Sequence, residues 1–115
     1  MRRSLRQMSM TGVLGLMCCA IFSPHASGQA EDLYKAHCAS CHGADGSGST
    51  TAGKKMGLRD LRSPQIQNLS DDELFKTIAY GVKHKQYPHA FVKRGLSEEQ
   101  ITQLVAYLRT LPKSK

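Results

Sequence analysis

The chain has 115 residues, with 16 lysines and arginines against 9 acidic residues, and 4 cysteines. This length favours one small domain. Aromatic residues make up only 6% of the chain and the basic residues do not alternate with them, so the positive charge does not indicate a nucleic-acid-binding protein.

The first thirty residues have the layout of a secretory signal peptide. Three arginines among the first six residues precede a short apolar stretch over residues 12–22, and small residues follow. A positive start, an apolar middle and a small-residue end are typical of such signals, whereas a membrane-spanning helix needs roughly twenty apolar residues. We therefore expect cleavage near residues 28–30, and a domain at 31–115 that has no spanning segment and is periplasmic or otherwise exported.

Removal of this segment changes the composition. Lysines and arginines fall from 16 to 13 and cysteines from 4 to 2, while all 9 acidic residues remain, so the expected mature chain has 85 residues and a net charge of +4. A domain of this size often depends on a disulfide, a metal or a cofactor to complete its core.

The first predicted helix, EDLYKAHC over residues 31–38, runs directly into the pair of cysteines. Residues 43–57 are rich in Gly, Ser and Thr and predict an irregular loop, and the connection continues through residue 69.

Two further helices have clear start signals. Ser70 and Glu73 form a capping-box pattern before an apolar face, and Gly81 ends that helix. Ser97 begins the last helix, whose apolar face is formed by Ile101, Leu104, Val105 and Leu108, at helical spacing. No segment alternates as a strand does, so the predicted fold class is all-α.

The pentapeptide Cys38-Ala-Ser-Cys41-His42 carries the chemistry. Two thiols at this spacing can add to the vinyl groups of a haem, and the histidine that follows can then coordinate the iron. A thioredoxin-like dithiol would lie near a strand–helix unit, which the sequence does not predict. A structural zinc site needs four ligands, and the expected mature chain has no further cysteine.

Together with the two capped helices, this motif resembles a small monohaem class I cytochrome c. The stretches DLYKAHCASCHGADGSG, LSDDELFKTIAYGVK and LSEEQITQLVAYLRTL carry the resemblance, which covers residues 31–112. It implies an all-α cytochrome c fold, with three main helices around one covalently attached haem c. Cys38 and Cys41 would form the thioether bonds, and His42 would be the proximal iron ligand.

The resemblance also implies that the first and last helices cross near the attachment site. Their expected contacts join Leu33 and Tyr34 of the first helix to Leu104, Tyr107 and Leu108 of the last.

The sequence departs from the family where the distal iron ligand is usually found. The family has a methionine followed by a proline before the last helix, and here Tyr87 precedes Pro88. Tyr87 is the candidate by position, bound through its phenolate oxygen. His89 and His84 are the alternatives, and a fourth is a sixth position that is empty or filled by water.

The predicted function is electron transport, one electron at a time, and not catalysis. The potential should be low because the methionine that stabilises ferrous iron is missing. The alternative is a ligand-binding or peroxidase-like haem protein with an open or labile sixth site. The protein is expected to be a monomer.

Basic residues bracket the ligand loop: Lys83, Lys85, Lys93 and Arg94. They suggest an acidic redox partner, such as an oxidoreductase or a terminal oxidase, that is steered electrostatically to the site.

Overall fold

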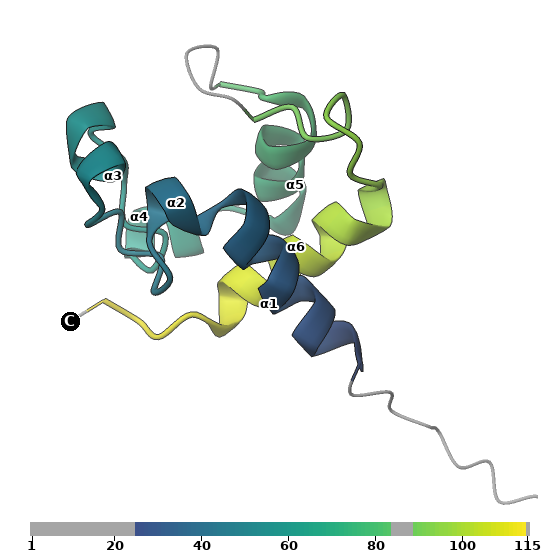
Figure 1. The fold of residues 1–115 in the computed structure, drawn as a ribbon, viewed down its shortest axis with the longest axis horizontal. Coiled ribbons are helices and arrows are strands. Elements are labelled where there is room, and N and C mark those ends of the chain that lie inside the picture. Colours follow the sequence, from purple (N-terminus) through teal and green to yellow (C-terminus); the bar gives the residue numbers. More distant parts are fainter. Residues whose placement is uncertain (1–24, 84–88, 115) are drawn as a thin grey trace, which may run out of the picture.

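The structure is a computed structural model that describes residues 25–83 and 89–114. Within these ranges every regular element is a helix, as Figure 1 shows. The helices are α1 His25–His37, α2 Ala39–His42, α3 Thr51–Met56, α4 Pro64–Gln67, α5 Asp71–Tyr80 and α6 Glu98–Thr110. The prediction of an all-α fold is confirmed.

The two capped helices begin and end as the sequence predicts. Ser70 accepts a hydrogen bond from the Glu73 amide, and the Glu73 carboxylate accepts one from the Ser70 amide at 2.9 Å. Gly81 ends α5 in the left-handed conformation, with φ of 70°. Ser97 and Gln100 form the equivalent capping box at the start of α6.

The helices at the two ends of the domain cross each other, and this crossing builds the main core (Figure 1). The Tyr34 ring of α1 lies 5.2 Å from the Tyr107 ring of α6, measured between centroids. Leu104 and Leu108 are buried in the same cluster, with Leu33 packed against it. The contacts that the family resemblance implied between the first and last helices are therefore present.

A second, smaller cluster joins α5 to α6 through Leu74 and Val105, with Ile66 of α4. Arg109 of α6 ties these elements together, because its guanidinium donates to the Gln67 carbonyl at 2.8 Å and to the Asp71 carboxylate.

The loop prediction for residues 43–57 is wrong in part, because α3 lies within it, and α4 lies in the connection that follows. Thr50 caps α3 by accepting a hydrogen bond from the Gly53 amide at 2.8 Å, and Gly57 closes it in the left-handed conformation. Pro64 occupies the first turn of α4, where a missing N–H costs nothing. Helices this short do not contain enough turns for a helical spacing of apolar residues, so in the sequence only their capping residues indicate them.

The first helix is longer than predicted, since α1 begins at His25 and not at residue 31. It therefore spans the predicted cleavage region, and cleavage itself stays a prediction. Among the described residues, no helix is both long and apolar enough to cross a membrane.

Candidate functional site

The pentapeptide lies where α1 gives way to α2. The Cys38 amide donates to the Tyr34 carbonyl at 2.8 Å, and the His42 amide donates to the Cys38 carbonyl at 2.9 Å, so the chain keeps a helical path through the motif. Residues three and four positions apart share one side of a helical turn. The helical path therefore brings Cys41 and His42 to the same side as Cys38.

Both thiols are free and half-buried. Burial raises the pKa of the Cys38 thiol to about 11, although the nearby Arg94 guanidinium acts to lower it and Cys41 adds to the rise. A catalytic dithiol depends on a thiolate whose pKa is lowered. The environment of Cys38 therefore does not suit the thioredoxin-like alternative, and the free thiols suit covalent attachment.

The segment after the pentapeptide is bonded back onto it. The Thr50 hydroxyl donates to the Cys41 carbonyl at 2.6 Å, the Gly48 amide donates to the His42 carbonyl at 2.7 Å, and the buried Tyr34 hydroxyl donates to the Gly43 carbonyl at 2.7 Å. These bonds fix the backbone around His42 from both sides.

Gly53 of α3 is pressed against the same carbonyls. A Cβ atom at this position would lie 2.6 Å from the Cys41 carbonyl oxygen and would overlap the Gly48 carbonyl. Only a residue without a side chain allows α3 to approach the pentapeptide this closely.

His89 lies across from His42, although 47 positions separate them in the sequence. The centroids of the two imidazole rings are 6.2 Å apart and the ring planes differ by 14°. The Nδ1 atom of each ring is buried. The structure therefore pairs the predicted proximal ligand with one of the predicted alternatives for the distal ligand.

The other two candidates, Tyr87 and His84, lie outside the described residues. The placement of Tyr87 at the methionine position therefore stays a prediction from the sequence.

Phe91 is a site residue that the sequence analysis did not single out. It is 4% exposed, and its ring lies 5.8 Å from His37, 6.3 Å from His89 and 4.6 Å from the Arg94 guanidinium carbon. The sequence contained one signal of this role, a large aromatic side chain between Ala90 and Val92 in the loop before the last helix.

The residues of the motif fit a covalent haem c. The free thiols of Cys38 and Cys41 lie three positions apart in a helical turn, directly before His42. The His89 imidazole lies across from His42 at a distance that leaves room for a metal ion between the two rings. These observations agree with the donor set that haem iron takes.

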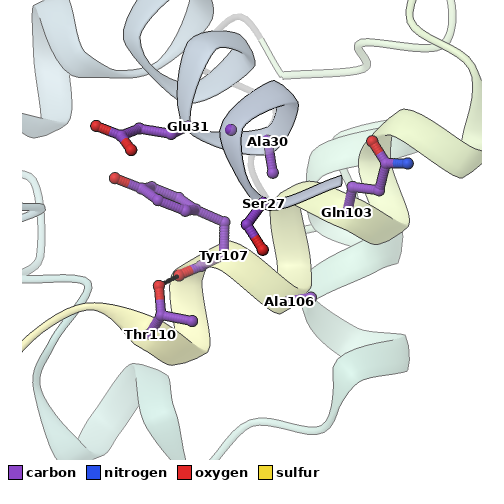
Figure 2. Close-up of a pocket in the computed structure, with 8 residues that line it drawn as sticks. Ser27, Ala30, Glu31, Gln103, Ala106, Tyr107 and Thr110 are labelled. Atoms are coloured by element: carbon purple, nitrogen blue, oxygen red, sulfur yellow. Dashed lines mark hydrogen bonds between the residues drawn. The ribbon is translucent and has the colours of Figure 1, made fainter. Parts of the chain in front are cut away.

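A separate hollow lies between α1 and α6 (Figure 2). Its lining includes Glu31, Gln103, Tyr107 and Thr110, whose hydroxyl donates to the Tyr107 carbonyl at 2.7 Å. Cys38, Cys41 and His42 are not among its lining residues, so this hollow is not the predicted site.

Comparison with known families gave a match to the family described as Cytochrome c, over residues 28–112. Comparison with curated proteins gave no significant match.

Proposed function

Because the chain belongs to the cytochrome c family, whose members are electron carriers with a covalent haem c, we propose that it is an exported, low-potential carrier of single electrons. The observation that carries the proposal is the helical turn with two free thiols and an adjacent histidine. In this proposal Cys38 and Cys41 hold the haem through thioether bonds, and His42 is the proximal iron ligand. When bound, the haem supplies a one-electron couple between ferric and ferrous iron.

The protein's own residues position the group and shield it. Bonds from Thr50 and Gly48 hold the Cys41 and His42 carbonyls, and the Tyr34 hydroxyl holds the adjacent Gly43 carbonyl. The His42 ligand therefore does not have to reorganise when the charge of the iron changes. Phe91 is buried beside His89 and keeps water from that side.

The proposed low potential has a direct test. A spectroelectrochemical titration of the haem-containing protein should give one one-electron transition, at a potential on the order of 100 mV below that of histidine–methionine members of the family. The reason is that thioether sulfur favours ferrous iron, and no methionine occurs after Met56. A methionine-like high potential would refute the low-potential part of the proposal.

We also propose that an acidic redox partner docks at the cations beside the pentapeptide. Lys93 and Arg94 are exposed in the turn that follows His89, and Arg94 is close enough to act on the pKa of Cys38. The positive charges of Lys93 and Arg94 would attract an acidic protein and orient it toward the haem.

Lys93→Glu should therefore slow electron exchange with an acidic partner protein by about tenfold at low salt, and raising the ionic strength should shrink the difference. Lys113→Glu is the matched control, because Lys113 is an exposed lysine near the C-terminal end of the chain. Stopped-flow rates that do not change with salt would argue against electrostatic docking.

A further inference from the structure

We propose that His89 is the distal ligand, so that two imidazoles, from His42 and His89, bind the haem iron from opposite sides. This inference rests on the proposed function, because the haem must first be attached at the pentapeptide. It assigns the sixth position to a described residue two positions beyond the one that matches the family's methionine.

The separation of the two rings is the first argument. An iron–nitrogen bond of about 2 Å, and a further distance of about 1.2 Å from each nitrogen to its ring centroid, would place two trans imidazole centroids about 6 to 6.5 Å apart. The observed separation of 6.2 Å lies within this range.

Direct packing explains the separation less well. Parallel rings in contact lie about 3.5 Å apart between planes. A centroid distance of 6.2 Å would then require a sideways offset of about 5 Å, which leaves almost no overlap between two five-membered rings. The pair is therefore far enough apart to hold an atom between the rings.

The buried nitrogens are the second argument. Nδ1 is the ring nitrogen nearer the backbone, and it is buried in both residues. A histidine that binds a metal through Nε2 keeps Nδ1 within the protein, where the surroundings fix the ring. In both side chains Nδ1 is buried, as binding through Nε2 requires.

The backbone that carries His89 is the third argument. The Phe91 and Val92 amides donate to the Ile78 and Ala79 carbonyls of α5 at 3.0 and 3.2 Å. Ala90, between His89 and Phe91, has φ of 61°, a left-handed conformation that is costly for a residue with a side chain. Such a conformation persists only where its surroundings enforce it, so the segment after His89 is anchored in one place.

The test uses the full-length protein matured with haem, in wild-type and His89→Ala forms. The wild type should be low-spin in the ferric state, and its reduced spectrum should not change under saturating carbon monoxide. His89→Ala should lose the low-spin ferric spectrum and bind carbon monoxide to saturation once reduced. Because the imidazole planes differ by only 14°, the wild-type ferric electron paramagnetic resonance spectrum should be rhombic, as nearly parallel ligand planes require.

His89→Met serves as a second variant, which keeps a strong ligand at the same position. It should remain low-spin and have a higher midpoint potential than the wild type. His37→Ala is the matched control: this exposed histidine also lies against the Phe91 ring, at 5.8 Å, and its removal should leave the spectrum and the potential unchanged.

The inference is overturned if His89→Ala stays low-spin and inert to carbon monoxide, or if His89→Met has the wild-type potential. A wild type that binds carbon monoxide freely would also overturn it, and would favour the ligand-binding or peroxidase-like alternative. If Tyr87→Phe alone abolishes the wild-type spectrum, the ligand is Tyr87. In each of these cases the haem is still covalently attached, so the proposed function is unaffected. The proposed function has its own test: it would be refuted if the wild type carried no covalent haem.

Discussion

The double variant Cys38→Ala/Cys41→Ala should lose covalent haem completely and with it most of the domain's stability. Every buried apolar residue of the described chain lies before residue 35 or after residue 65. The part that includes the pentapeptide and α3 therefore has no apolar core of its own, and the haem would supply it. A small domain has a free energy of unfolding of only about 5–15 kcal/mol, so loss of the cofactor should leave it close to unfolded.

Haem staining after denaturing electrophoresis measures the attachment, and circular dichroism with amide exchange measures the folding. Residues 39–57 should exchange fastest in the double variant, because their core is missing. Cys18→Ala/Cys19→Ala is the control, since these cysteines belong to the predicted signal peptide and their loss should change neither measurement. A double variant that retains covalent haem would contradict the proposed attachment.

Gly53→Ala should destabilise the haem-containing protein by on the order of 3 kcal/mol, a large effect for one methyl group. The added Cβ would lie 2.6 Å from the Cys41 carbonyl oxygen, and a backbone carbonyl cannot turn aside as a flexible side chain can. The backbone must shift, which breaks the Thr50 hydrogen bond to Cys41 and disturbs the adjacent His42. Chemical denaturation measures the loss, and the visible spectrum reports any change at the iron.

Gly57→Ala, at the residue that ends α3, provides the comparison. A Cβ at Gly57 has no atom within 4 Å, so its only cost is the left-handed φ of 64°, about 1–2 kcal/mol. Its spectrum should match that of the wild type. If the two variants lose the same stability and have the same spectrum, the close approach of α3 has no special effect on the pentapeptide.

The sequence was informative wherever local chemistry decides the structure. Ser70 with Glu73, and Ser97 with Gln100, gave the starts of α5 and α6, because capping depends on residues three positions apart. The crossing of α1 and α6 could be predicted only from the family resemblance, since apolar periodicity does not say which helices meet.

The parts that could not be predicted depend on contacts that are distant in the sequence. α3 was missed because its Gly and Thr residues lower helix propensity, and the fit of Gly53 against Cys41 cannot be read from the sequence. Counting positions from the family pattern gave Tyr87 as the first candidate and His89 as an alternative, and Tyr87 lies outside the described residues. The pairing of His42 with His89 depends on how the chain turns at Ala90, where the sequence has no glycine to mark a positive φ.

The crossing of α1 and α6 also bears on the order in which the protein is assembled. Tyr34 and Leu104 pack into one cluster although 70 positions separate them, so this cluster cannot close until α6 has been synthesised. The proposed attachment residues lie within five consecutive positions. In the proposed attachment, covalent capture of the haem would therefore come before closure of the fold, and the captured group would be in place when the last helix docks.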